Sequence, residues 1–125
     1  MGVVGGLVGN ASKIANATIA EEIGRLLIPG EKIEHAYKLI RDYFVFTSKR
    51  LILVDRQGVT GKKVEYDSIP YSRITHFSIE TAGHLDFDSE LSIWVAGLRT
   101  PIQKTFSRKL NIFEVQTVLA TYVLR

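Results

Sequence analysis

The hydrophobic and polar positions between residues 31 and 106 repeat mostly with a period of two, which is the period of a β-strand. Two apolar runs, at 43–47 and 51–55, are rich in aromatic and branched side chains and meet across the polar sequence T-S-K-R. Such side chains favour a pleated, half-buried surface. The pattern therefore predicts two adjacent antiparallel strands joined by a short polar turn.

Five more strands are expected, one before this pair and four after it. In each of them apolar and polar positions alternate, and the turns between them are polar or contain glycine or proline. In the first of them, alternation places Ile33, His35, Tyr37 and Leu39 on one face. The expected strands are 31–39, 63–68, 73–81, 86–95 and 101–106.

The stretch 86–95 has the cleanest alternation in the sequence. It places apolar residues such as Leu91 and Ile93 on a face that we expect to be core, and Ser92 and Trp94 on the opposite face. An outward aromatic side chain on a strand indicates an interface. The alternative is that Trp94 is buried under the C-terminal helix or the N-terminal segment, and the pattern leaves both open.

A short amphipathic helix is predicted before the strands. Thr18 and Glu21 have the spacing of a capping box, and Pro29 followed by glycine is expected to end the helix. Four apolar residues recur on one side at helical spacing and should face the sheet or another copy of the chain. They are Ile19, Ile23, Leu26 and Leu27.

A second amphipathic helix is predicted at the C-terminal end. Asn111 can cap its first turn, Glu114 can reach back to that cap, and Leu110 can pack against Val115 as a hydrophobic staple. The buried stripe should consist of Ile112, Val115, Leu119 and Tyr122.

These elements predict a mainly β fold in which about seven antiparallel strands form a small barrel, a C-terminal helix caps it, and an extra helix precedes it. The 125 residues suit one domain. We expect this domain to span 18–125 and to follow an apolar, glycine-rich segment at 1–17.

The segment 1–17 carries apolar side chains that would be unfavourably exposed in water. Its glycines oppose a helix, and glycines four apart permit close approach of a neighbouring backbone. A contact with another subunit and a loosely docked terminus are both open. The apolar residues are Val3, Val4, Leu7 and Val8.

The sequences F-V-F-T-S-K-R-L-I-L-V-D at 44–55 and V-E-Y-D-S-I-P-Y-S-R-I at 64–74, together with the terminal helix, resemble the bacterial pleckstrin-homology (PH)-like family, long described only as a domain of unknown function. The pattern T-x-x-R-L-I followed by I-P-Y-x-x-I recurs in such domains. The resemblance covers about residues 20–125 and implies the PH fold of seven strands and a closing helix.

The resemblance further implies a binding or assembly module with a tendency towards homo-oligomeric rings, and no catalytic motif. The eukaryotic lipid-binding PH domains resemble one another in a basic cluster on the first hairpin, which binds inositol phosphates. This chain has Lys38, Arg41 and Asp42 there, and no basic residue from 43 to 46. A phosphoinositide is therefore not expected as a partner.

Composition changes this interpretation little. The chain has 16 Lys and Arg against 13 Asp and Glu, a formal charge of +3, and its basic residues are spread along the sequence rather than gathered in runs. Nucleic-acid binding is therefore not expected. Because there is no cysteine, disulfides and thiolate chemistry are excluded. The N-terminus lacks the charged leader of a signal peptide, so a cytoplasmic protein is expected.

Candidates for catalysis or metal binding are few. His84, Asp86, Asp88 and Glu90 alternate along one strand face, but a straight strand spaces such side chains about 6–7 Å apart, too far to share one ion. No nucleophile motif or phosphate-binding loop is present. His35 and His76 lie among apolar neighbours and are interpreted as structural histidines. We therefore expect no enzyme activity, metal or cofactor.

Self-association would cover both Trp94 and the apolar residues of 1–17, and sheet edges offer unpaired backbone groups for it. We therefore expect a non-catalytic module that forms homo-oligomers or binds another protein. The alternative is a monomeric module that recognises a peptide or an anionic membrane surface. Its candidate anion-binding residues are Lys38, Arg41, Lys49 and Arg50.

Overall fold

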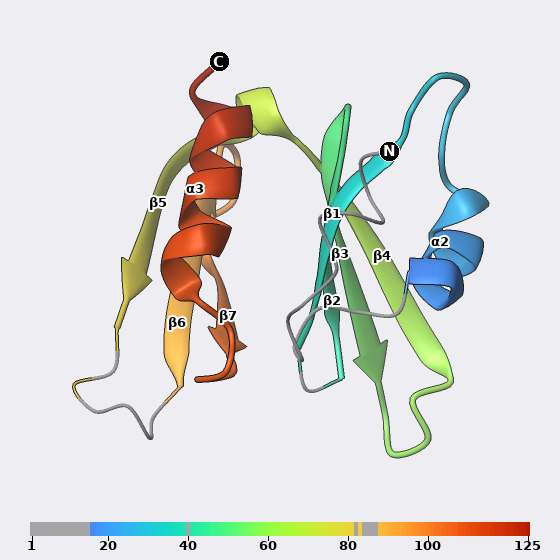
Figure 1. Cartoon of the computed structure of the whole chain (residues 1–125), viewed down its shortest axis with the longest axis horizontal. Helices are drawn as coiled ribbons and strands as arrows, with labels where there is room; N and C mark the ends of the chain where they lie inside the picture. Colours follow the sequence, from blue (N-terminus) through green and yellow to red (C-terminus); the bar gives the residue numbers. More distant parts are fainter. Residues whose placement is uncertain (1–15, 40, 82, 84–87) are drawn as a thin grey trace. The chain divides into compact units, whose positions relative to one another are not determined.

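The computed structural model describes residues 16–39, 41–81, 83 and 88–125, and in this part of the chain it is mainly β (Figure 1). Seven antiparallel strands form two sheets, with a helix before them and a helix after them. This confirms the predicted fold class and order of elements. The helices and strands are α2 (Asn16–Gly24), β1 (Ile33–Lys38), β2 (Tyr43–Thr47), β3 (Arg50–Gln57), β4 (Lys63–Pro70), the 3-10 helix η1 (Tyr71–Arg73), β5 (Ile74–Glu80), β6 (Ser89–Val95), β7 (Ile102–Phe106) and α3 (Ile112–Val123).

The chain divides into two compact units, residues 1–68 and residues 69–125. The described part of the first unit holds α2 and the sheet with strand order β1-β2-β3-β4. The second unit holds η1, α3 and the sheet with strand order β5-β6-β7. The predicted division into a segment 1–17 and a domain 18–125 stays a prediction.

The β2–β3 hairpin forms as its pattern predicts, with Tyr43 opposite Val54 and Phe46 opposite Leu51. Alternate residues of the hairpin point to opposite faces of the sheet, and each face contributes buried apolar side chains. One group, which includes Val45 and Ile52, packs with α2 in a single cluster, so the helix buries its apolar side on this sheet. The buried members of that cluster are Ile19, Ile23, Ile33, Ala36, Val45, Ile52 and Val54.

The predicted face of the first strand is wrong. The register between β1 and β2 shifts between Ile33 and His35, which marks a bulge or irregularity. Such a shift breaks the two-residue period, so residues on either side of it no longer share the expected face. As a result Ile33 joins the α2 cluster together with Ala36, while His35 and Tyr37 contact the ring of Phe46 instead.

The predicted bounds of the first helix are also wrong. Thr18 lies inside α2 and cannot be its N-cap, because the helix already includes Asn16. The helix ends at Gly24 rather than near Pro29, and the backbone N–H of Leu26 then bonds the carbonyl of Ile23 at 2.8 Å in a tighter turn. Glycine is a poor helix former, which explains the early end.

Polar contacts hold α2 on its sheet. The Glu22 carboxylate binds Arg56 Nη2 at 2.6 Å and accepts the Tyr66 hydroxyl at 2.6 Å. Partial burial opposes the charge of Glu22, but these two hydrogen bonds outweigh it and lower the pKa of that carboxyl. The same contact raises the pKa of Tyr66. One acidic residue of the helix therefore joins β3 and β4.

The second unit is built around α3. Asn111 caps the helix by accepting the backbone N–H of Phe113 at 3.0 Å, as predicted. The buried residues of α3 are the four of the predicted stripe. Tyr122 at its end stacks on Tyr71 of η1, with ring centroids 4.7 Å apart. The motif I-P-Y-x-x-I therefore places Tyr71 to hold the end of the helix.

Two predictions about the N-terminus lie outside these observations. Val3, Val4, Leu7 and Val8 fall outside the described residues, so their interface role stays a prediction. No helix in the described part of the chain is long and apolar enough to cross a membrane. The cytoplasmic location stays a prediction as well.

Candidate interaction surface

Arg50, one of the four predicted anion-binding residues, makes an ion pair inside the first unit. Its Nε and Nη2 atoms bind the two carboxylate oxygens of Glu31, each at 2.9 Å. Its guanidinium also donates to the carbonyl of Leu26 and, at 3.0 Å, to the hydroxyl of Ser68. Arg50 therefore ties the segment before β1 to the end of β4, and a carboxylate already neutralises its charge.

Thr47 completes this buried site. Its hydroxyl donates to Glu31 Oε2 at 2.6 Å and accepts the backbone N–H of Arg50 at 2.9 Å. Burial by itself would raise the pKa of Glu31, whereas the hydrogen bonds from Arg50 and Thr47 lower that pKa to about 2. The pattern T-x-x-R thus acts as a structural clamp on Glu31.

The other three basic residues do not gather around Arg50. Lys38 ends β1 and Arg41 lies in the turn before β2, whereas Lys49 lies in the turn after β2. The five residues of β2 separate these turns by about 15 Å. Arg41 also donates to the carbonyl of Gly58 in the β3–β4 turn. The predicted set is therefore two groups at opposite ends of one hairpin.

Trp94 lies on the outward face of the β5–β6–β7 sheet, as its alternation with Leu91 and Ile93 predicts. Those two neighbours are buried, whereas Trp94 is half-buried. Its ring meets the exposed His76 ring edge to face, with centroids 4.5 Å apart and an angle of 69°. The Thr75 hydroxyl also donates to the Trp94 carbonyl at 3.3 Å. A large aromatic side chain is thus held in place and left partly open to water.

The middle of this face is polar. Ser92 lies between Ser78 on β5 and Gln103 on β7, and the Gln103 amide donates to the Ser92 hydroxyl at 3.3 Å. Beyond this row, Glu80 lies opposite Glu90. The face therefore has an aromatic end, a neutral middle and an acidic end.

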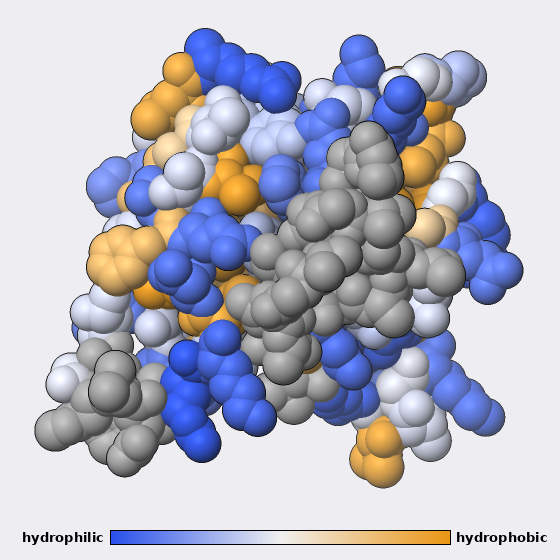
Figure 2. Space-filling view, viewed as in Figure 1, coloured by the Kyte–Doolittle hydropathy of each residue, from blue (hydrophilic) through white to orange (hydrophobic). Residues whose placement is uncertain are grey.

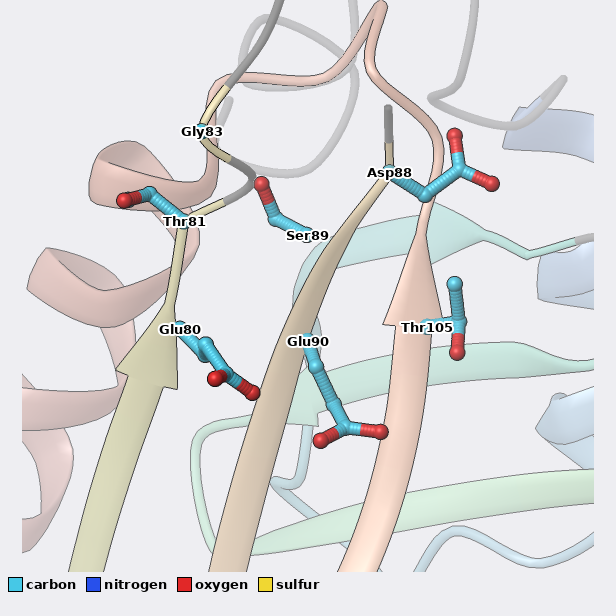
Figure 3. Close-up of a pocket in the computed structure, with 7 residues that line it drawn as sticks. All are labelled: Glu80, Thr81, Gly83, Asp88, Ser89, Glu90 and Thr105. Carbon is cyan, nitrogen blue, oxygen red and sulfur yellow. The ribbon is translucent and has the colours of Figure 1, made fainter.

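The acidic end forms an open pocket of about 390 Å³ (Figure 3). Figure 3 shows the side chains of Glu80 and Glu90 on neighbouring strands, with Asp88 at the start of β6. Asp88 accepts the backbone N–H of Arg108 at 3.1 Å. Among the described residues no group of three potential ligands could hold a metal, and His84 and Asp86 of the predicted set lie outside that part of the chain.

The two described histidines have packing roles. His35 is half-buried and meets the Phe46 ring edge to face at 6.3 Å. His76 is exposed and packs on Trp94 instead of entering the core. His76 is therefore part of the outward face.

Sequence analysis missed two residues that bear on function. Glu31 was assigned only to a strand, since its partner Arg50 is 19 residues away and no local pattern links them. Val59 was overlooked as a turn residue, yet it is fully exposed at 103% between Gly58 and Gly61, both of which have positive φ angles. A lone valine between two turn glycines is the signal that could have found it.

The surface is otherwise mainly polar, with scattered apolar positions. Figure 2 shows hydrophobic surface over α3 and at the tip of the β3–β4 hairpin. Phe113 on α3 is 59% exposed. Trp94 is the single tryptophan of the chain and is half-buried on a sheet. Tryptophan is enriched at protein interfaces. We therefore regard the outward face of β5–β6–β7 as the candidate interaction surface.

Known proteins resemble the chain over almost its whole length. A sequence model of the family described as bacterial PH domain matches residues 2–123. The uncharacterized protein YjqA of Bacillus subtilis (strain 168) is 54% identical over 121 residues, which is 96% of this chain and 97% of that protein.

Two solved structures are similar in fold and in sequence. A pleckstrin homology domain from Shewanella amazonensis SB2B has a TM-score of 0.82 and 48% identity, covering 98% of both chains. A DUF1696 family protein with a pleckstrin-homology domain from Shewanella loihica PV-4 has a TM-score of 0.80 and 45% identity, covering 92% of this chain and 98% of that one.

Proposed function

Because this chain belongs to the bacterial PH domain family, we propose that it is a non-catalytic module that assembles with copies of itself, rings included, or with another protein. The observation that carries the proposal is the half-buried Trp94 on the outward face of β6, packed on His76. Tryptophan is enriched at interface centres, where burying its ring is strongly favourable. The row beside this pair, Ser78, Ser92 and Gln103, carries no formal charge, which suits a contact that must lose water.

The state of two carboxylates, the partly buried Glu22 and the buried Glu31, supports a non-catalytic role. Arg56 and Tyr66 lower the pKa of Glu22, and Arg50 and Thr47 lower the pKa of Glu31. Such carboxylates stay ionised at neutral pH, whereas a general acid or base needs a pKa near the working pH. Both are already occupied in contacts that hold the fold.

The first prediction concerns Trp94. We expect Trp94→Ala to weaken self-association by about 2 kcal/mol, or about 30-fold in Kd, because truncation at an interface centre removes a large buried ring. The measurement is the absolute mass by light scattering after size exclusion, over a series of concentrations. Phe113→Ala is the matched control, because it removes an exposed aromatic ring from α3.

A second arm removes residues 1–15 and leaves α2 complete. A multimer that dissociates on this truncation would place the contact in the N-terminal segment, and one that survives would favour Trp94 and the strand edges. If the full chain is a monomer at every concentration and salt, the assembly proposal fails. A stable multimer that loses mass with Phe113→Ala as readily as with Trp94→Ala would reject the role of Trp94.

One observation favours the alternative, recognition of an anionic membrane surface. Arg41 bonds the β3–β4 turn, so Lys38, Arg41 and the exposed Val59 lie at the same end of the first sheet as Lys62 and Lys63. An apolar tip beside basic residues suits a lipid headgroup layer. A peptide partner stays a prediction without such support.

This alternative predicts flotation with vesicles of phosphatidylcholine and phosphatidylserine, but not with phosphatidylcholine alone. Binding should weaken steeply between 50 and roughly 300 mM salt, because exposed charges are screened. Apolar self-association should not weaken in that range. Vesicle binding that is independent of salt or of phosphatidylserine would contradict the charge-based mechanism.

A further inference from the structure

Trp94 marks one end of the outward face of β5–β6–β7 as a place where a cation can bind. The face of an indole ring attracts a guanidinium or an ammonium group more strongly than the other aromatic side chains do. His76 meets the ring in an edge contact, which holds it in place and leaves it half-buried. The ring therefore keeps surface that a flat cationic group could cover.

Glu80 and Glu90 form a pair of like charges at the other end of the same face. They lie directly opposite each other on β5 and β6, so both side chains are on one side of the sheet (Figure 3). Like charges in this position destabilise a sheet. In the described part of the chain neither carboxylate takes part in an ion pair. A cation from another molecule could neutralise both.

The surface between these two points accepts a chain laid across it. Its row of Ser78, Ser92 and Gln103 carries no charge that would repel a basic segment, and its hydroxyl and amide groups can form hydrogen bonds. The pocket of about 390 Å³ at the acidic end leaves room for an arginine side chain. The whole face is thus complementary in charge to a basic partner.

We propose that this face binds an extended basic segment of another protein, with one arginine on the Glu80–Glu90 pair and a second arginine on Trp94. The inference rests on the proposed function and specifies the chemistry of the partner. Four residues of β6 separate Trp94 from Glu90, a distance of about 13 Å. In an extended segment, side chains four residues apart point to the same side with the same spacing. The expected recognition sequence is therefore R-x-x-x-R.

Arginine suits both points better than lysine. Its guanidinium has five donors in a planar fork, so it can bind one carboxylate with two parallel hydrogen bonds and still donate to the second. The same planar group stacks on an indole ring, whereas lysine offers a compact point charge. We therefore expect a peptide K-T-S-T-K to bind more weakly than R-T-S-T-R.

The intrinsic fluorescence of Trp94 tests the proposal, because it is the single tryptophan of the chain and lies in the site. The full chain is titrated with the capped peptide R-T-S-T-R, and we expect a saturable change with a Kd below about 1 mM. Binding should weaken as salt is added. The matched peptide T-R-S-R-T has the same composition, but its arginines are two residues apart. It cannot reach both points and should bind about fivefold more weakly.

A charge-neutral variant tests the acidic end. Glu80→Gln combined with Glu90→Gln keeps the size of both side chains, and it should weaken binding of R-T-S-T-R about tenfold. Its stability in urea should be unchanged or higher, because the like-charge pair is gone. Glu21→Gln combined with Glu65→Gln is the matched control, since it removes the same charge from exposed positions of the first unit. It should bind like the natural chain.

Three results would overturn the proposal. Equal affinity for R-T-S-T-R and T-R-S-R-T would reject the two-point arrangement. Equal weakening by the Glu80/Glu90 variant and by the control variant would show that net charge alone attracts the peptide. A neutral peptide L-T-S-T-L that binds as tightly as R-T-S-T-R would show that the face takes an apolar partner instead of a basic one.

Light scattering of the same samples separates this inference from the proposed function. A multimer that binds none of the peptides overturns the basic partner and leaves assembly standing. A monomer that binds R-T-S-T-R supports contact with another protein and overturns self-association. A monomer that binds none of them overturns both. Circular dichroism of each variant checks that it is folded.

Discussion

Arg50→Ala is expected to lower the free energy of unfolding by about 3–5 kcal/mol, because it leaves a buried carboxylate without its cation. The side chain of Glu31 is 0% exposed, and both of its oxygens bind the Arg50 guanidinium. The substitution also removes the donors to Leu26 and Ser68. Urea unfolding followed by far-ultraviolet circular dichroism measures the loss, which corresponds to roughly 10–20 °C in Tm.

Arg99→Ala is the matched control, since Arg99 is exposed in the turn between β6 and β7. A change within about 0.5 kcal/mol is expected there. The double variant Arg50→Ala with Glu31→Gln should lose less stability than Arg50→Ala alone, because no unpaired charge stays buried. Equal losses for Arg50→Ala and Arg99→Ala would show that the ion pair does not stabilise the fold.

The same ion pair gives the protein a specific acid sensitivity. The pKa of Glu31 falls from its ordinary value of 4.5 to about 2 on folding. The resulting stabilisation is therefore complete above about pH 4.5 and disappears as the pH falls towards 2. Its size is about 3 kcal/mol, from 1.36 kcal/mol for each pKa unit. Unfolding of Glu31→Gln should depend less on pH between these values, and an unchanged pH profile would contradict this assignment.

The sequence pattern predicted those elements correctly whose ends are determined by residues only a few positions away. The β2–β3 hairpin and α3 formed as expected because their turn, cap and apolar spacing are all encoded within a few residues. Alternation also placed Trp94 correctly on the outward face. The same method failed at β1, because a single register shift after Ile33 reverses every later assignment of faces.

The candidate site was harder to predict because its geometry depends on distant residues. Four basic residues close in sequence were grouped into one anion site, yet β2 separates the turn that holds Arg41 from the turn that holds Lys49. Arg50 was assigned to an anion-binding site because nothing near it in the sequence indicates Glu31 as its partner. His76 was assigned to packing, and only the pairing of β5 with β6 places it beside Trp94.

Leu119→Ala is expected to lower the free energy of unfolding by about 2–5 kcal/mol, because it leaves a cavity where α3 packs in the second unit. Leu119 is 0% exposed and lies in the buried stripe of the helix between Val115 and Tyr122. Alanine keeps the helix propensity, so the loss reports packing rather than helix formation. Urea unfolding followed by circular dichroism measures it.

Phe113→Ala is the control on the same helix. Phe113 is 59% exposed, so removing its larger side chain should cost well under half as much as removing Leu119. If Phe113→Ala lowered the free energy of unfolding more than Leu119→Ala, the loss would follow side-chain size instead of burial. That result would contradict the assignment of the buried stripe. The expected order would instead establish that α3 is held by its apolar side, because the cost of each substitution would then follow the burial of the side chain on the helix and not its size.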